Sequence, residues 1–121
     1  MFEIKVETSF SAGHHLRGYR GSCERPHGHN WKVAVTIEKE KINRLGIIYD
    51  FRRLKRELEK VVSVLDHQDL NTLPQFKKEN PSSENIARWI YLQLKPQIKR
   101  GRVKEIQIWE SQGTSVIYRE E

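Results

Sequence analysis

Two runs in the first third of the chain alternate apolar and polar residues. Residues 2–11 and 29–37 each place every second side chain on one apolar face, a pattern typical of strands buried on one side. A turn over 43–46 leads to the short apolar run IIYD at 47–50, which predicts a return strand. The second run and this return strand are therefore expected to form an antiparallel hairpin.

A helical period follows the return strand. Asp50 is a suitable N-cap, and the helix would bury apolar residues spaced three and four apart, namely Phe51, Leu54, Leu58, Val61, Val62 and Leu65. Residues 66–81 are interrupted by prolines and predict a long loop, a kind of segment that often carries function. Ser82 or Ser83 then caps a second helix.

The C-terminal part returns to alternating segments at 103–110 and 115–119, separated by a turn at Gly113. The order of elements is then β-β-α-α-β-β with antiparallel hairpins, which indicates an α+β fold. Because 121 residues contain neither a linker nor an internal repeat, we expect one domain spanning 1–121.

Charge and composition narrow the classes of function. The net charge of +6 suits either nucleic acid or a small polyanion such as a triphosphate. The basic residues are scattered and are not interleaved with clustered aromatic residues, so a nucleic-acid surface is disfavoured. No apolar run is long enough to span a membrane, and the N-terminus lacks the apolar core of a signal peptide. A single cysteine excludes an internal disulfide, and we expect a cytoplasmic protein.

The segment CERPHGHN carries candidate metal ligands. His27 and His29 lie two residues apart at the start of a predicted strand, so both side chains point to one side and can chelate Zn²⁺. A catalytic zinc site takes three protein ligands, and the third would come from the pair His14 and His15. Surface or hydrogen-bonding histidines are the alternative, although four of the five histidines lie within residues 14–29.

Cys23 is the only cysteine and belongs to the same segment. As a fourth ligand it would close an inert, structural Cys-His₃ site. As a free thiol beside the metal and Arg25 it would favour the thiolate and act as a base or nucleophile. The adjacent Glu24 opposes the thiolate. A merely apolar, buried cysteine is disfavoured in so polar a loop, and the spacing leaves the first two alternatives open.

Three further residues are candidates for proton transfer or ligand binding. In Asp66-His67, the aspartate can orient the imidazole ring and form a proton-shuttling pair. The alternative is a helix-terminal His⁺ favoured by the helix dipole. Glu110 ends an apolar strand and can accept paired hydrogen bonds from a ligand, unless it is simply solvated.

In combination, these segments resemble the 6-pyruvoyl-tetrahydropterin synthase family, which includes the 6-carboxy-tetrahydropterin synthases of queuosine biosynthesis. The matching motifs run in the family's order from residue 2 to the C-terminus: FSAGHHL, CERPHGHN, GIIYDF, LDHQDLN, NPSSENIA and the terminal WE…VIYRE. The resemblance implies the tunnelling fold (T-fold), a four-stranded antiparallel sheet with two helices packed on one face. It also implies a homohexamer of two stacked trimers with active sites between subunits.

The resemblance also assigns the metal centre and the catalytic thiol. The family's zinc ligands fall on His14, His27 and His29, and His15 is not a ligand. The family's catalytic cysteine falls on Cys23, with the C-x₃-HGH spacing of the carboxy-pterin synthases.

The remaining family positions concern proton transfer and the pterin ring. The Asp-His pair falls on Asp66 and His67, usually supplied by a neighbouring subunit. The pterin-anchoring glutamate falls on Glu110, with Ser83 lining the pterin pocket. Glu24 departs from the pattern, because a branch that forms 6-hydroxymethyl-dihydropterin uses a glutamate here in place of the cysteine.

The resemblance therefore implies a zinc-dependent lyase that converts 7,8-dihydroneopterin triphosphate to 6-carboxy-5,6,7,8-tetrahydropterin, acetaldehyde and triphosphate. Formation of 6-pyruvoyl-tetrahydropterin, or of a hydroxymethyl-pterin through Glu24, is the alternative among enzymes. A non-catalytic zinc protein that binds nucleic acid, with Cys23 as fourth ligand, is the alternative from another class. The expected partners are a pterin triphosphate and further copies of the chain, with no nucleic acid and no membrane.

Overall fold

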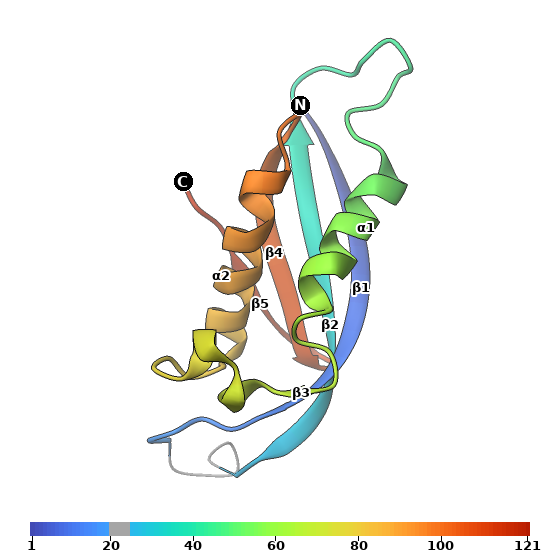
Figure 1. Ribbon diagram of the computed structural model, residues 1–121. Coiled ribbons are helices and arrows are strands. Elements are labelled where there is room, and N and C mark those ends of the chain that lie inside the picture. The colour runs from blue at the N-terminus through green and yellow to red at the C-terminus, as the bar shows by residue number, and fades with distance from the viewer. Residues whose placement is uncertain (20–24) are drawn as a thin grey trace.

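The computed structural model describes residues 1–19 and 25–121 and shows one sheet with two helices on one of its faces (Figure 1). In the order of the sheet the strands are β3 (Gln68–Asp69), β1 (Phe2–His14), β2 (His27–Lys39), β4 (Arg102–Ser111) and β5 (Thr114–Tyr118). All neighbouring strands are antiparallel except the two-residue β3, which is parallel to β1. The expected α+β fold is confirmed, with five strands in the sheet where four were predicted.

The hairpin that opens the sheet differs from the expected one. β1 and β2 pair along their whole length, so that His14 lies opposite His27. The return strand predicted at 47–50 is wrong, because this segment is irregular. Ile48 and Tyr49 are buried in the core without joining the sheet, so their apolar character reflects packing and not strand pairing.

Both helices begin at predicted caps. α1 (Phe51–Val62) is capped by Asp50, whose carboxylate accepts hydrogen bonds from N–H groups of the first turn. α2 (Ser83–Leu94) is capped by Ser82, whose hydroxyl accepts from a backbone N–H at 3.1 Å. Ser83 is therefore the first helical residue and not the cap.

The core fills the space between the helices and the sheet. Trp31 is fully buried, stacks on Phe10 with ring centroids 5.8 Å apart, and donates its Nε1–H to the carbonyl of Ala12 at 3.1 Å. The helices contribute Leu54, Leu58, Val61, Val62, Ile86, Ala87, Ile90, Tyr91 and Leu94. Phe51 was predicted in this stripe, but its exposure of 58% shows that it faces solvent at the start of α1.

The segment between the helices, which we call the interhelical loop (residues 66–81), contains β3 and two short 3₁₀ helices, η2 (Leu70–Thr72) and η3 (Pro74–Phe76). A third, η4 (Lys95–Gln97), follows α2. The interhelical loop lies at the end of the sheet that contains the C-terminal end of β1 (Figure 1). It is therefore placed to contact any site formed there.

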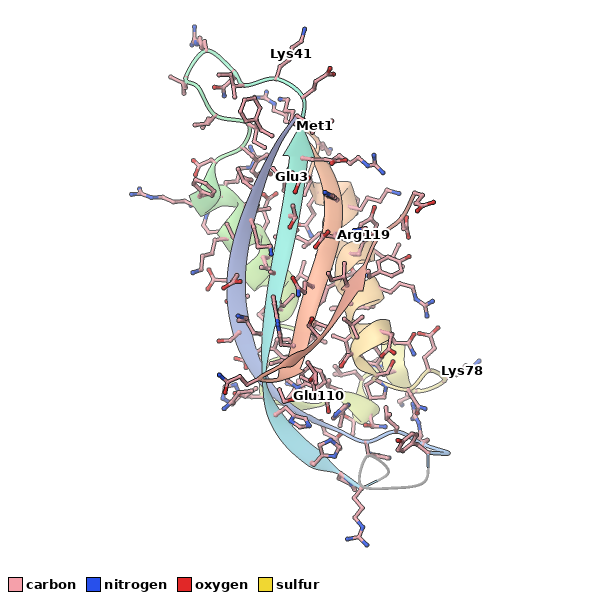
Figure 2. The ribbon with its side chains drawn as sticks, turned by 180° about the vertical axis from the view of Figure 1, so that it is seen from behind. Met1, Glu3, Lys41, Lys78, Glu110 and Arg119 are labelled. Atoms are coloured by element: carbon pink, nitrogen blue, oxygen red, sulfur yellow. The ribbon has the colours of Figure 1, made fainter. Side chains whose placement is uncertain are left out.

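The face of the sheet turned away from the helices is polar (Figure 2). Charged side chains pair across its strands, including Lys104 with Glu3, and Arg119 with Glu105 at 2.8 Å. Among the described residues no helix is long and apolar enough to cross a membrane.

Replacing Asp50 with alanine removes the carboxylate that caps α1. We expect the free energy of unfolding to fall by about 1 kcal/mol, which lowers Tm by about 3–6 °C in a domain of this size. Asp50→Asn is the matched control, because asparagine caps helices about as well as aspartate. Thermal unfolding followed by circular dichroism measures the three proteins, and an unchanged Tm in Asp50→Ala would contradict the capping role.

Candidate metal centre

Three histidines and one glutamate converge at the end of the sheet where β1 meets β2. His14 is the last residue of β1 and lies opposite His27, the first residue of β2. His29 follows two residues later, so its side chain points to the same side as that of His27. Glu110 reaches the group from β4, and one potential ligand atom from each side chain lies within 4.8 Å of the others. The structure thus brings the three predicted metal ligands together.

Glu110, labelled in Figure 2, lies near the end of β4, and its carboxylate contacts all three imidazole rings. Its Oε1 atom is 3.0, 3.6 and 2.8 Å from the Nε2 atoms of His14, His27 and His29, respectively. The sequence predicted a ligand-binding role for Glu110 but not this contact. The pairing of β4 with β2, which produces it, cannot be read from residue spacing.

Backbone carbonyls determine which nitrogen of two rings faces the centre. His14 Nδ1 is 2.7 Å from the carbonyl oxygen of Pro81, and His27 Nδ1 is 2.6 Å from that of Arg25. A carbonyl oxygen can only accept, so each Nδ1 carries a hydrogen and each Nε2 faces the centre. His14 Nε2 is hydrogen-bonded there to Glu110 Oε1, and a bound metal would take the place of the hydrogen in that contact. Metal-binding histidines are typically held in this way.

The third ring supplies the test of whether a metal fits. His29 Nε2 is buried and has no hydrogen-bond partner among the described residues, although Glu110 Oε1 is only 2.8 Å away. The two atoms are close, but the orientation of the imidazole relative to the carboxylate does not allow a hydrogen bond between them. A cation placed between the nitrogens and the carboxylate would satisfy all of these atoms. Three imidazole nitrogens with a nearby oxygen are a donor set that suits zinc.

The charges of the group also favour a cation. Burial lowers the pKa of His29, and the attraction of Glu110 offsets only part of this effect. Burial acts to raise the pKa of Glu110, but contacts with His14 and the other rings outweigh it and hold that pKa below its ordinary value. The ionised carboxylate is thus stabilised by its contacts with the ring nitrogens, and a cation bound to these nitrogens would stabilise it in the same way.

A pocket adjoins the carboxylate on its other side. The hydroxyl of Ser83 donates a hydrogen bond to Glu110 Oε2 at 3.4 Å. The two residues line a pocket of about 190 Å³ together with Glu84 and residues 114–116. The two residues predicted to hold the substrate ring are thus neighbours, and they lie directly beside the histidines.

Trp31 forms the buried wall of the centre. Its ring meets those of His14 and His29 edge-on, with centroids 4.9 and 5.6 Å apart. The tryptophan is fully buried, so the histidines rest on the hydrophobic core rather than on a mobile surface. The spacing of the histidines and carboxylates in the sequence does not predict that Trp31 supports the site. It does not predict the contacts of the Pro81 and Arg25 carbonyls either.

Asp66 and His67 form the predicted pair and are anchored to β1. Asp66 Oδ2 is 3.0 Å from His67 Nδ1. The backbone of Ser11 donates to Asp66 Oδ1 at 2.9 Å and accepts from the His67 N–H at 2.6 Å. The Ser11 hydrogen bond, assisted by His67, holds the pKa of Asp66 below its ordinary value. The aspartate therefore remains ionised beside the imidazole.

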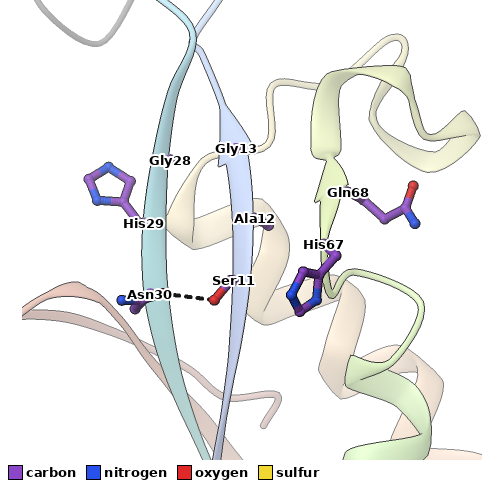
Figure 3. Close-up of a pocket in the computed structure, with 8 residues that line it drawn as sticks. All are labelled: Ser11, Ala12, Gly13, Gly28, His29, Asn30, His67 and Gln68. Atoms are coloured by element: carbon purple, nitrogen blue, oxygen red, sulfur yellow. Dashed lines mark hydrogen bonds between the residues drawn. The ribbon is translucent and has the colours of Figure 1, made fainter.

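Within one chain the pair lies apart from the histidine cluster. Figure 3 shows the His67 ring beside β1 and the His29 ring on the far side of β2. The His67 side chain is 81% exposed, and its backbone adopts a positive φ of 59°. His29 and His67 both line a shallow pocket of about 350 Å³ over the paired strands β1 and β2. The structure therefore joins Asp66 to His67 but does not bring them to the metal centre.

Two predicted residues, Cys23 and Glu24, lie outside the residues that the structure describes. Their roles stay predictions from the motif.

Comparisons with known proteins agree with this arrangement. The family model described as 6-pyruvoyl tetrahydropterin synthase matches residues 3–121. A protein of Archaeoglobus fulgidus, provisionally named 6-carboxy-5,6,7,8-tetrahydropterin synthase, is 40% identical over 105 residues, covering 84% of this chain and 86% of the relative. The dihydroneopterin monophosphate aldolase of Pyrococcus furiosus is 33% identical over 108 residues, covering 88% of each chain.

The fold has close counterparts among solved structures. The 6-pyruvoyl tetrahydropterin synthase of Caenorhabditis elegans superposes with a TM-score of 0.90 at 26% identity, covering 99% of this chain and 96% of that one. The T-fold expected from the sequence is thereby confirmed.

Removal of one ligand should abolish metal binding. We expect about one zinc ion per chain in the wild-type protein and almost none in His14→Ala, because the remaining rings cannot complete the site. His15→Ala is the matched control, since His15 is adjacent in sequence but does not belong to the cluster. Metal analysis after dialysis against zinc measures all three proteins. Equal zinc loss in both variants would contradict the assignment.

Proposed function

The chain belongs to the 6-pyruvoyl tetrahydropterin synthase family, and on this premise we propose that it is a zinc-dependent lyase acting on 7,8-dihydroneopterin triphosphate. The reaction consumes one water, and the proposed products are 6-carboxy-5,6,7,8-tetrahydropterin, acetaldehyde and triphosphate. The observation that carries the proposal is the convergence of three histidines beside the pocket of Glu110 and Ser83. A carboxylate that binds the pterin ring beside a metal centre would bring the side chain of the pterin against the metal.

The metal would be held by His14, His27 and His29, whose Nε2 atoms converge. Bound zinc supplies a Lewis acid that acidifies C–H and O–H groups of a side chain lying against it. Glu110 is ionised and can accept two hydrogen bonds from the N–H and NH₂ groups of a pterin ring. Ser83 steadies this carboxylate through its hydroxyl. These residues would orient the pterin so that its side chain points to the histidines.

Proton transfer is assigned to Cys23 and His67. Cys23 precedes His27 in the motif C-x₃-HGH, and its thiolate would remove a proton from the substrate side chain. His67 holds its Nδ1 against the ionised Asp66, which directs Nε2 outward as a proton relay.

We place the Asp66-His67 pair in the active site of a neighbouring subunit of a homohexamer. The exposure of His67 and its separation from the cluster within one chain support this placement. β5 is an edge strand of the sheet, so pairing with another copy would extend the sheet.

Mass spectrometry of the products formed from 7,8-dihydroneopterin triphosphate by the zinc-loaded protein tests the proposal. We expect 6-carboxy-tetrahydropterin together with acetaldehyde. Cys23→Ala should lower kcat by roughly 10²–10⁴-fold, the usual contribution of a general base, while its zinc content stays at the wild-type level. Undiminished turnover in zinc-loaded Cys23→Ala would show that the thiol is not the base.

An aldolase reaction that yields 6-hydroxymethyl-dihydropterin is the second candidate. It is favoured by the 33% identity with the aldolase of Pyrococcus furiosus and by the presence of Glu24 beside Cys23. The same assay separates the two reactions, because a hydroxymethyl product lost in Glu24→Gln and kept in Cys23→Ala would assign the chemistry to Glu24. Formation of 6-pyruvoyl-tetrahydropterin would release no acetaldehyde. A zinc protein that only binds nucleic acid would convert no pterin.

A further inference from the structure

The interhelical loop runs along the edge of β1 that faces away from β2. In an antiparallel pair every second residue directs its backbone N–H and C=O groups away from the partner strand. On this edge Ser11 bonds to the backbone of His67, and Gly13 lies in the parallel pairing with β3. Beyond the end of β1, the next outward positions are His15 and Arg17.

Two asparagine side chains replace a strand at these positions. Asn71 accepts from the His15 N–H at 2.9 Å and donates to the His15 carbonyl at 3.1 Å. Asn80 accepts from the Arg17 N–H at 2.9 Å and donates to the Arg17 carbonyl at 3.0 Å. Each amide thus makes both hydrogen bonds that a neighbouring strand would make.

Further hydrogen bonds of both Arg17 and Asn80 reinforce the contact between these two residues. The Arg17 guanidinium donates through Nε to Asn80 Oδ1 at 3.3 Å and through Nη2 to the carbonyls of Glu79, at 2.7 Å, and Phe76. The backbone carbonyl of Asn80 accepts from Asn85 Nδ2 at 2.9 Å. Asn80 is therefore held through its side chain and its backbone.

The residue that follows Asn80 is Pro81, whose carbonyl accepts from His14 Nδ1 at 2.7 Å. His14 is only 2% exposed, so water cannot readily take the place of this carbonyl. The nitrogen that carries the ring hydrogen is set by the hydrogen bond that the other nitrogen makes. Displacement of Pro81 would release the hydrogen to Nε2 and block the nitrogen that faces the cluster.

We propose that Asn80 is a positioning residue for the metal centre. By holding the backbone of Arg17, it places the Pro81 carbonyl so that His14 keeps its hydrogen on Nδ1 and offers Nε2 to the metal. This inference rests on the metal centre of the proposed function and adds a residue that does not touch the metal. Groups hydrogen-bonded directly to metal-binding histidines influence metal affinity by about 10–100-fold when mutated. The Pro81 carbonyl is such a group, and loss of Asn80 would act by displacing it.

A purely structural role for Asn80 makes a different prediction. If the asparagine only covers the edge of β1, its loss should lower stability without a selective effect on zinc. Asn43 provides the comparison, because its Oδ1 likewise accepts two hydrogen bonds, here from backbone N–H groups at 2.9 and 3.2 Å in the turn after β2. That turn lies at the opposite end of the sheet from the interhelical loop (Figure 1).

The test measures zinc affinity by competition with a chromogenic chelator in the full chain. We expect the dissociation constant for zinc to rise by about 10–100-fold in Asn80→Ala and to stay at the wild-type value in Asn43→Ala. Asn80→Asp keeps the two acceptor contacts to Arg17 but places a carboxylate oxygen against the Arg17 carbonyl, so it should raise the constant as well. Equal zinc affinity in folded Asn80→Ala and in the wild type would overturn the proposal.

Nitrogen NMR of the imidazoles in the metal-free protein provides a readout that does not depend on zinc. We expect Nδ1 of His14 to carry a hydrogen in the wild type and to lose it in Asn80→Ala, where the hydrogen remains on Nε2 beside Glu110; an unchanged Nδ1 signal would overturn the proposal. If the wild type binds no zinc, the proposed metal centre fails, and the NMR comparison alone decides the role of Asn80. If Asn80→Ala does not fold, Asn80→Asp and Asn43→Asp give the same comparison, and equal zinc affinities in that pair overturn the proposal.

Discussion

The antiparallel pairing of β1 with β2 is the interaction on which the rest of the molecule depends. Because it continues to the last residue of β1, His14 is held opposite His27, and the alternation of the strand adds His29 on the same face. Trp31, two residues after His29, packs against the rings of His14 and His29 and connects them to the hydrophobic core. A slip of one residue would turn one strand's ligands to the opposite face and dismantle the site.

The surroundings of the three rings direct their Nε2 atoms and the carboxylate of Glu110 at one volume. Carbonyls hold a hydrogen on the far nitrogen of two rings, and burial lowers the pKa of the third ring. Glu110 connects this volume to the neighbouring pocket, since one carboxylate oxygen contacts the histidines and the other accepts from Ser83. Metal binding and substrate binding would therefore share a residue, and a change at Glu110 should affect both.

Periodicity was sufficient to predict the α+β class, the two helices and the cap at Asp50, because these features depend on local sequence. The strand predicted at 47–50 was wrong, since a short apolar run looks the same whether it joins a sheet or packs irregularly in the core. The HGH spacing pointed to His27 and His29, but the choice of His14 over His15 as the third ligand came from the resemblance to the family. The Pro81 carbonyl and the contact of Glu110 were not predictable, because backbone acceptors carry no residue signature and strand order depends on the whole chain.

Three histidines, two of them oriented by backbone carbonyls and two packed against Trp31, would form an open metal centre in which Cys23 is not a ligand. Zinc K-edge X-ray absorption of the zinc-loaded protein without substrate tests it most directly, with Cys23→Ala as the control. We predict a first shell of imidazole nitrogens at about 2.0–2.1 Å with oxygen, identical in both proteins. A sulfur scatterer at about 2.3 Å that disappears in Cys23→Ala would contradict the claim and indicate a closed, structural site.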